Sequence, residues 1–321
     1  MMRATTVPET RRSTSVVVHY GDLEPTVRLA NHLADFDTDV VVVANDRSPR
    51  PESLPERVEW IVPGRNLGYG EAFMTAVRGR STEALVLLNN DIALPRETFE
   101  RCLDTLLAAG DIGVVGPVLR HDDDSLQSGA ARLTRWRRVP RVLVDPGPVT
   151  VECTWVTGAV MFIRREVAQQ VGMDGSFFLG AEDADLCIRA RRAGWRILCC
   201  GDAVATHHGS RVIGARWNYY STRNRVWYTR ACFGLGPALL NWVCAAATLP
   251  RVALADLVKR GDMTASRLSL LALAHAWRRK PAADEGPLAG EPFPDRLIGS
   301  RRPIGAQQVV VHVGEPAQRD R

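Results

Sequence analysis

Apolar runs and helix-spaced apolar positions alternate along the first part of the chain. Four short β-branched or aliphatic runs predict buried strands, and polar or turn residues follow each of them. They span residues 15–20, 39–44, 58–62 and 84–88. Apolar positions at helical spacing predict helices between these runs and again after Pro95. Because strands that alternate with helices form parallel sheets covered on both faces, we expect an α/β fold with a mostly parallel sheet.

The pattern changes twice further along. Shorter strand-like pieces continue the sheet to about residue 208, with 122–129 as an exposed loop and a helix at 182–193. After residue 211 the pattern becomes helical, at 215–233, 237–259 and 263–279. We therefore expect an α/β domain with a C-terminal helical extension. The predicted units are a flexible N-terminus 1–14, the α/β domain 15–212 with halves of about 15–120 and 121–212, a helical region 213–280 and a flexible tail 281–321.

Composition narrows the class of protein. The chain has 321 residues, 45% of them hydrophobic and 24% charged, which is typical of a soluble protein with a core large enough for an enzyme. Most of the net charge of +5 lies after residue 250, and nothing upstream forms a basic stripe, so we expect no nucleic-acid partner. Seven scattered cysteines within apolar runs indicate reduced, buried thiols rather than a zinc site. Residues 1–15 lack an apolar core segment, so we expect a cytoplasmic protein.

One stretch raises the question of a membrane. Arg230 and Arg251 enclose 20 uncharged residues, numerically enough to cross a bilayer. Two prolines and two polar residues interrupt the run, so we favour a packed helical hairpin. The alternative is a peripheral membrane contact. It is supported by the next segment, where Leu268, Leu271 and His275 form an apolar face that ends in the basic residues 278–280.

Asn89 and Asp91 follow a buried strand directly. Ligands of such sheets bind beyond the carboxyl ends of the strands, so both side-chain oxygens can enter one cleft. Hard divalent cations prefer oxygen ligands, and one carboxylate with one amide leaves positions open for phosphate oxygens. The alternative is an ordinary turn before the helix at Pro95.

Glu182, Asp183 and Asp185 begin a predicted helix. Capping and the helix dipole explain one acidic residue there, but not three. One of them could therefore face the cleft as a general base. Phe177 and Phe178, between glycines, suggest an apolar wall beside them.

Two further segments carry candidate ligands. His207 and His208 end a strand and could bind a metal or phosphate, although such a pair is more often structural. Residues 66–70, NLGYG, offer backbone amides at a helix entrance, suited to phosphate. Phe73 stands where a dinucleotide-binding motif needs its third glycine, so the segment does not match that motif.

Taken in order, these pieces resemble the family 2 glycosyltransferases with the GT-A fold, in particular a rhamnosyltransferase-like branch of bacterial cell-wall and O-antigen assembly. The similarity runs from residue 16 to about 225. It rests on VVVHYGD, VVVANDRSP, NLGYGEAF, LLNNDIALP, GPVL with LQSG, TGAVMFIRRE, FFLGAEDADLCIRARRAGW, AVATHHGS and the Arg223-Asn224 pair.

The resemblance implies an inverting, metal-dependent transfer of a hexose, rhamnose among the options, from a dTDP- or UDP-sugar to a hydroxyl acceptor on a lipid-linked glycan or natural product. The catalytic residues would be Asp183, as the base, and Glu182, which together with Asp185 would position the acceptor and the loop. The divalent cation, Mg²⁺ or Mn²⁺, would be held by Asp91, Asn89 and His207. The expected nucleotide-sugar contacts are Tyr20, Asn45, Asp46, Asn66, Gly68 and Asn90, and the expected acceptor contacts are Trp155, Gly158, Phe178 and Asp185.

Departures from the family pattern keep other functions open. Ala44 stands where the family commonly has a base-contacting aspartate, and Asn89 occupies the first position of the metal motif. A catalytically silent sugar-nucleotide-binding or scaffold protein is therefore the main alternative, and a nucleotide-dependent oxidoreductase is the third. The sequence leaves the oligomeric state open.

Overall fold

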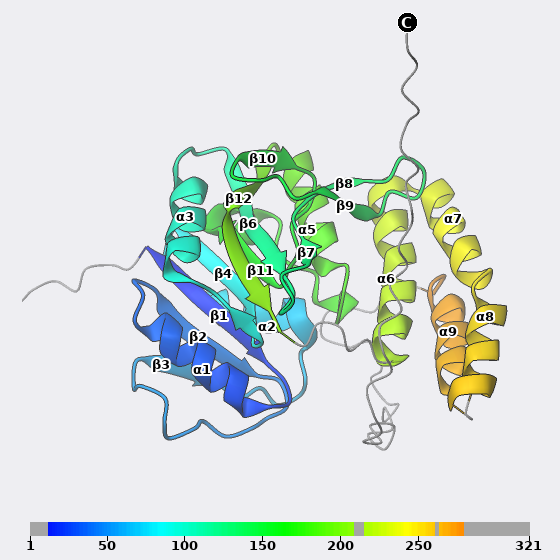
Figure 1. Cartoon of the computed structure of the whole chain (residues 1–321), viewed down its shortest axis with the longest axis horizontal. Coiled ribbons are helices and arrows are strands. Elements are labelled where there is room, and N and C mark those ends of the chain that lie inside the picture. The colour runs from blue at the N-terminus through cyan, green and yellow to red at the C-terminus, as the bar shows by residue number, and fades with distance from the viewer. Residues whose placement is uncertain (1–11, 209–214, 261–262, 279–321) are drawn as a thin grey trace, which may run out of the picture.

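The computed structural model describes residues 12–208, 215–260 and 263–278. Within them an α/β domain is followed by a layer of helices (Figure 1). The strand at the centre of the N-terminal half is β1, Ser13–His19, so the ordered domain begins slightly before the predicted residue 15. The predicted tail 281–321 lies outside the described residues.

One large sheet forms the domain, and its principal strand order is β10-β12-β6-β11-β4-β1-β2-β3. Strands β1, β2, β3 and β4 are parallel, as are β6 and β12, whereas β11 runs antiparallel to both β4 and β6. The sheet is therefore largely parallel, as predicted. The strands are β2 Asp39–Ala44, β3 Val58–Ile61, β4 Ala84–Asn89, β6 Ile112–Arg120, β10 Thr150–Cys153, β11 Val160–Arg164 and β12 Arg196–His207.

Both faces of the sheet are buried, which explains the continuous apolar runs. Side chains alternate between the faces, so Val17 packs in one core cluster and Val16 and Val18 in the other. Helices α1 (Leu23–Ala34) and α3 (Arg96–Leu107) cover the first face. The second is covered by α2 (Gly68–Val77), α4 (Arg165–Gln170) and α5 (Glu182–Arg192).

The sequence missed several short elements. The predicted loop 122–129 contains strand β7, Leu126–Ser128, which pairs with β6. The last of the strand-like pieces predicted up to residue 208 form one strand, β12, whose register shifts between Cys200 and Val204. The elements without a sequence prediction are β5 Ile92–Ala93, β8 Ala130–Leu133, β9 Pro140–Val144, α4 and the 3-10 turn η1 Gly175–Phe177.

The helical region begins with α6, Ala215–Phe233, which lies between the α/β domain and the outer helices (Figure 1). The outer helices are α7 Leu235–Ala246, α8 Leu249–Ala255, the π-helical turn η2 Asp256–Arg260 and α9 Thr264–His275. The apolar face predicted for a membrane on α9 packs inward instead. Leu268 and Leu271 contact the Tyr219 cluster on α6, and His275 Nδ1 lies 2.6 Å from Tyr219 Oη.

By length and composition alone, one helical stretch of the described residues could cross a membrane. It is Leu235–Val258, with a mean hydropathy of 1.4 over its apolar window, and only 11% of that window is buried. Core helices also pass this test, but they are mostly buried. One side of this stretch is therefore packed, as predicted for a helical hairpin, and the other side is exposed.

Candidate active site at the carboxyl edge of the sheet

The end of β4 and the end of β12 meet at one edge of the sheet. Asn89 is the last residue of β4, and the next turn leads into β5. Strand β5 pairs with β12 so that Ile92 lies opposite His207. This pairing places His207 against Asp91 although 116 positions separate them.

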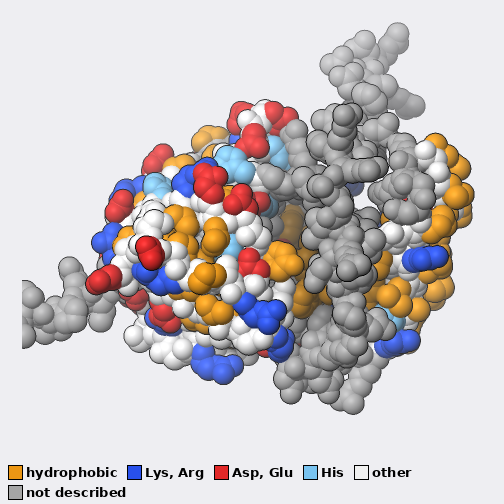
Figure 2. Space-filling model, turned by 90° about the horizontal axis from the view of Figure 1, so that it is seen from below, with side chains coloured by type: hydrophobic (Ala, Val, Ile, Leu, Met, Phe, Trp, Pro, Cys, Tyr) orange, Lys and Arg blue, Asp and Glu red, His pale blue; other side chains and the backbone are white. Residues whose placement is uncertain are grey.

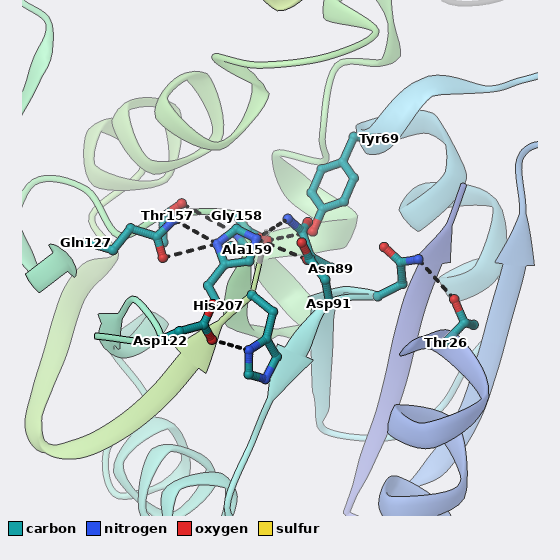
Figure 3. A network of polar contacts seen from close by, with 12 residues as sticks. Thr26, Tyr69, Asn89, Asp91, Asp122, Gln127, Thr157, Gly158, Ala159 and His207 are labelled. Carbon is teal, nitrogen blue, oxygen red and sulfur yellow. Dashed lines mark hydrogen bonds and ion pairs between the residues drawn. The ribbon is translucent and has the colours of Figure 1, made fainter. Parts of the chain in front are cut away.

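His207 is the centre of a polar network (Figure 3). Its Nε2 lies 3.0 Å from Asp91 Oδ1 and 3.1 Å from the Asn89 amide nitrogen. On the other side of the ring, Nδ1 lies 2.8 Å from the side-chain amide of Gln127. The imidazole is 8% exposed, so these contacts fix its orientation. A histidine held in this way through one ring nitrogen is typical of a metal-ligating arrangement.

Asp183 reaches the same edge from helix α5. Its Oδ2 accepts a hydrogen bond of 2.9 Å from Gly158 N, and its Oδ1 accepts one of 2.7 Å from Ala184 N. The Gly158 carbonyl in turn accepts a hydrogen bond of 2.7 Å from Tyr69 Oη. Gly158 precedes Ala159, whose carbonyl accepts from Asn89 N at 3.0 Å. Asp183 is therefore connected to the Asn89 strand end through two adjacent residues.

The hydroxyl of Tyr69 points toward Gly158 in this network (Figure 3). Burial raises the pKa of its phenol well above the ordinary value, and the charges of Glu182, Asp183 and Asp91 raise it further. Tyr69 is thus hydrogen-bonded to the residue whose amide holds Asp183. The structure brings the predicted base and the predicted metal-binding residues to one site.

Glu182 is buried beside Asp183. Its side chain is 4% exposed, and its Oε2 has no hydrogen-bond partner among the described residues. Burial raises the pKa of Glu182 to about 8, and the neighbouring Asp183 contributes to the rise. The pKa of Asp183 is also raised by burial, although its backbone hydrogen bonds oppose the shift. The pair therefore retains protons to a higher pH than ordinary carboxylates.

The predicted nucleotide contacts are placed around the ends of β1 and β2. Asn45 joins β2 to α2, because its amide donates to Gly68 O at 2.8 Å and accepts from Leu67 N at 3.2 Å. Asp46 accepts hydrogen bonds from Gly21 N and Ser48 and lies 3.2 Å from His19 Nε2. These two side chains order the strand ends. Tyr20 is exposed and directly precedes Gly21, whose amide donates to Asp46.

Asn66 and Asn90 make local contacts near this edge. Asn66 Oδ1 accepts from Gly68 N at 2.8 Å, at the entrance to α2. Gly68 has φ +74°, and an added Cβ would lie 2.4 Å from Phe178 O. Asn90 donates to Thr26 Oγ1 at 3.0 Å, at the start of α1. Glycine at 68 thus allows the α2 entrance to approach the loop before α5.

The predicted acceptor contacts divide into two groups. Gly158 donates to Asp183, and the buried indole nitrogen of Trp155 has no hydrogen-bond partner among the described residues. Phe178 stacks its ring on Tyr220 of α6, with centroids 5.1 Å apart. Asp185 is 3% exposed and pairs with Arg189 at 2.6 Å. The side chains of Phe178 and Asp185 are therefore engaged with neighbouring elements.

Helix α6 holds the loop that leads into α5. Arg223 donates to Phe177 O at 3.0 Å, and Asn224 Nδ2 lies 2.7–2.9 Å from the carbonyls of residues 177, 179 and 180. Both side chains are at most 1% exposed. The loop needs this support, since Phe178, Gly180 and Ala181 all have positive φ.

Arg223 is buried without a carboxylate partner among the described residues. Its guanidinium lies 4.0 Å from the ring centroid of Trp227, and the rings of Tyr219 and Tyr220 are at 5.3 and 5.0 Å. These aromatic faces stabilise the desolvated cation. The Arg-Asn pair was visible in the sequence, but its contacts were not. Tyr69 and Gln127 were also given no role from the sequence.

The chemistry of Asp91, His207 and Asn89 fits a divalent cation. Two ligands at adjacent corners of an octahedron with bonds of about 2.1 Å lie about 3.0 Å apart. That is the separation of Asp91 Oδ1 and His207 Nε2. No group of three His, Cys, Asp or Glu side chains suited to a metal occurs within the described ranges, so Asn89 and the ligand itself would have to complete the coordination.

Asp91 also borders a hollow of about 400 Å³ on the α1 side. Arg28, Leu29 and His32 of α1 line one wall, and His208 is at its rim. The edge around Asp91 is therefore open on its α1 side.

A largely parallel sheet with acidic residues converging beyond its strand ends is the architecture of enzymes that bind ligands at this edge. The chain belongs to the family described as Glycosyltransferase like family 2, which matches residues 3–229. The predicted family and the GT-A fold are thereby confirmed.

Curated relatives are distant. The O-antigen biosynthesis protein RfbC of Myxococcus xanthus is 26% identical over 192 residues, and the match covers 53% of this chain and 15% of that protein. The chain therefore spans only a small part of that relative. The uncharacterized protein Rv1525 of Mycobacterium tuberculosis is 27% identical over 214 residues, covering 62% of this chain and 74% of that protein.

Solved structures share the fold at low sequence identity. The mannosyltransferase PcManGT of Pyrobaculum calidifontis, solved with GDP-Man and Mn²⁺, aligns with a TM-score of 0.52 and 17% identity over 84% of this chain and 88% of that one. GalNAc-T7, solved with UDP, GalNAc and Mn²⁺, aligns with a TM-score of 0.57 and 12% identity over 87% and 56% of the two chains.

Proposed function

We propose that this glycosyltransferase moves a sugar from a nucleotide-diphosphate donor to a hydroxyl acceptor, with inversion at the anomeric carbon and with a divalent cation. One observation carries the proposal. The Asp183 carboxylate and the Asp91–His207 pair lie at the same sheet edge, joined through Gly158 and the Asn89 strand end. A single displacement requires a base at the attacking oxygen and a positive charge at the leaving group, so one cleft must contain both.

Asp183 is the base in this proposal. Two backbone amides hold its carboxylate, one on each oxygen, and each oxygen keeps a free lone pair for an acceptor hydroxyl. The carboxylate takes the hydroxyl proton while the acceptor oxygen bonds to the anomeric carbon. The bond from that carbon to the diphosphate breaks with its electron pair leaving on the phosphate oxygen. Burial raises the pKa of Asp183, which makes it a stronger base.

Asp91, His207 and Asn89 would hold the cation. When bound, the cation neutralises the charge that develops on the departing diphosphate. Gln127 fixes the ring of His207 so that Nε2 faces Asp91. The backbone amides at the entrance to α2 and the ends of β1 and β2 are suited to the nucleotide.

The donor and acceptor classes are inferred from chemistry and relatives. The neighbouring structures contain GDP-Man or UDP together with Mn²⁺, which supports a nucleotide sugar and a divalent ion here. The relative in O-antigen biosynthesis supports a role in polysaccharide assembly. We infer a dTDP- or UDP-hexose donor, rhamnose included, and a lipid-linked acceptor at the inner face of the cell membrane.

The proposal is tested by measuring release of the nucleoside diphosphate from a panel of nucleotide sugars, with and without EDTA. We expect EDTA and Asp91→Ala to abolish turnover. Asp183→Asn should lower kcat by about a thousandfold while donor binding persists, since it removes only the base. Asp104→Ala is the matched control, because this aspartate is exposed on α3 and pairs only with Arg12 among the described residues.

Undiminished turnover by Asp91→Ala and Asp183→Asn would refute the assigned roles. Donor binding without turnover across the acceptor panel would favour the silent binding protein instead. Calorimetry of donor binding to the same variants separates loss of binding from loss of catalysis.

A further inference from the structure

An apolar stripe follows the outer side of the helical region. Helices α7 and α8 and the turn η2 form one continuous stretch, and large apolar side chains point outward from it at helical spacing. Their exposed fractions range from 37% to 73%. We call the following set the outer stripe: Leu235, Leu239, Leu240, Val243, Leu254, Leu257 and Val258.

The inner side of the same stretch carries its polar groups. Asn241 is 1% exposed and donates to Arg137 O at 2.8 Å while its Oδ1 accepts from Arg137 Nε at 2.9 Å. Asp256 is fully buried and accepts hydrogen bonds from Ser266 N and Oγ at 2.8 and 2.6 Å. The exposed side of this stretch is thus more apolar than that of a helix on the surface of a protein in water, where the apolar side faces inward.

Exposed charge in this region has one sign. Among residues 215–260 and 263–278, Asp256 is the one carboxylate, and it is buried. Exposed arginines accompany the stripe. They are Arg230 at the end of α6, Arg251 on α8, Arg267 on α9 and Arg278 just after α9, and Leu270 of α9 is exposed as well. On the face shown in Figure 2, apolar side chains gather along the outer edge of the helical region with basic side chains among them.

We propose that the outer stripe docks on an anionic lipid bilayer, with the α7–α8 stretch lying in the plane of the interface. Apolar side chains enter the acyl boundary, and the arginines beside them contact lipid phosphates. A second copy of the chain fits less well. Two such surfaces would bring arginines against arginines with no exposed carboxylate of the described region to pair them.

The stretch lies on the membrane rather than crossing it. Its inner side is occupied by α6 and α9, through Ala238 and Trp242, and by the buried polar contacts of Asn241 and Asp256. Crossing would expose those polar groups to lipid, where no water can satisfy their hydrogen bonds. Only the outer side is free to enter the bilayer.

Docking here would place the reaction near the membrane surface. Helix α6 connects the outer helices to the site, since Trp217 packs against Gly180 and the Arg223-Asn224 pair holds the loop before Asp183. The docking proposal itself rests on exposure and charge and does not require the proposed catalytic function.

Co-sedimentation of the full chain with vesicles tests the proposal without donor or acceptor. We expect binding to vesicles of equal phosphatidylcholine and phosphatidylglycerol, little binding to phosphatidylcholine alone, and release by salt. The double variant Leu254→Glu with Leu257→Glu should weaken binding by more than about tenfold. Arg251→Gln, Arg267→Gln and Arg278→Gln should each weaken it about fivefold on the anionic vesicles.

Val62→Glu and Val149→Glu are the matched controls, because these valines are 50% and 53% exposed on the α/β domain. Their vesicle binding and thermal unfolding should equal those of the original chain, as should the thermal unfolding of the leucine variant. Equal binding by the leucine variant would overturn the proposal. So would a dimer in light scattering that the leucine variant abolishes, or a vesicle-bound protein that resists both salt and carbonate extraction.

Discussion

At the scale of single residues, Glu182 is a buried carboxyl group whose pKa is raised. Its pKa is raised from 4.5 to about 8, first by burial and then by Asp183. The folded state therefore retains a proton between these pH values that the unfolded state has released. Stability from this group is complete below about pH 4.5 and is lost as the pH rises toward 8.

Glu182→Gln should remove this dependence. The amide keeps the shape and cannot ionise, so we expect the variant to gain on the order of 2 kcal/mol in free energy of unfolding at pH 9 relative to pH 5. Urea unfolding at the two pH values measures the difference. Glu97→Gln is the control, since Glu97 is exposed on α3, and it should shift stability equally at both. Parallel pH profiles for Glu182→Gln and the original chain would contradict the prediction.

Gly68 is the residue where the backbone leaves no room for a side chain. An added Cβ would lie 2.4 Å from Phe178 O, and φ is +74°. Gly79 has nearly the same φ, +78°, but nothing lies within 4 Å of its added Cβ. Gly79→Ala should therefore cost only the left-handed strain, about 1–2 kcal/mol. Gly68→Ala should cost about 3 kcal/mol or more in free energy of unfolding, because the loop before α5 must also move away from the added methyl group.

Thermal unfolding of these two alanine variants separates strain from collision. Gly68→Ala should also lower kcat, since Tyr69 N donates to Phe178 O at 2.7 Å and both elements border the site. Equal destabilisation by the two variants would show that the close contact between α2 and the loop before α5 adds nothing to the cost of Gly68→Ala.

At the scale of elements, α6 controls the loop that leads into α5. Asn224 Nδ2 faces three carbonyl oxygens, so Asn224→Asp would replace a donor with an acceptor against all of them. We expect kcat to fall by at least about tenfold while the KM for the donor changes little, because the donor side lies on other strands. Arg230→Lys, on the exposed end of the same helix, should leave both constants unchanged.

Steady-state kinetics with circular dichroism of the folded variants tests this prediction. A general loss of structure in Asn224→Asp would appear as a lower melting temperature. The kinetic constants are therefore compared at a temperature where the variant and the original chain are folded to the same extent. If kcat is retained in a fully folded Asn224→Asp, the α6 contacts do not position the base.

The sequence predicted the long elements well and the connections poorly. Strands such as Asp39–Ala44 are buried on both faces, so their apolar runs are unambiguous. The two-residue β5 has no pattern of its own, yet its pairing with β12 places His207 at Asp91. Gln127 was assigned to a loop because β7 has only three residues. Short pairings depend on tertiary contacts, which local patterns do not record.

The residue types of the candidate site could be predicted from the sequence, but their hydrogen-bond and ion-pair partners could not. Acidic residues at a helix start and polar residues after a strand indicated Asp183 and Asp91, and both lie at one edge. Which side chains are engaged elsewhere was not visible. Asp185 pairs with Arg189 one helical turn further along α5, and Asp46 accepts hydrogen bonds from Gly21 and Ser48, so both carboxylates are engaged within the fold. The alternative that Leu268 and Leu271 of α9 face a membrane was wrong, since these side chains pack against the Tyr219 cluster of α6.

At the scale of the whole molecule, binding of metal and of nucleotide should be coupled. Asp91, His207 and Asn89 offer few protein ligands, so a cation would depend on diphosphate oxygens to complete its shell. Mn²⁺ alone should therefore raise the melting temperature little, and a nucleoside diphosphate alone little more. Together they should raise it by several degrees, because a ligand that binds only the folded state stabilises it by its occupancy.

Differential scanning fluorimetry in the four combinations measures this coupling, with UDP, dTDP and GDP as the nucleotides. His207→Ala and Asp91→Ala should abolish the joint effect and leave the melting temperature of the free protein within a few degrees. Gln127→Leu should weaken it by a smaller factor, about 10–100-fold in apparent metal affinity, because it frees the ring of His207 without removing the ligand. Independent, additive shifts from metal and nucleotide would mean that the two bind apart from each other, and the shared coordination at Asp91 would be wrong.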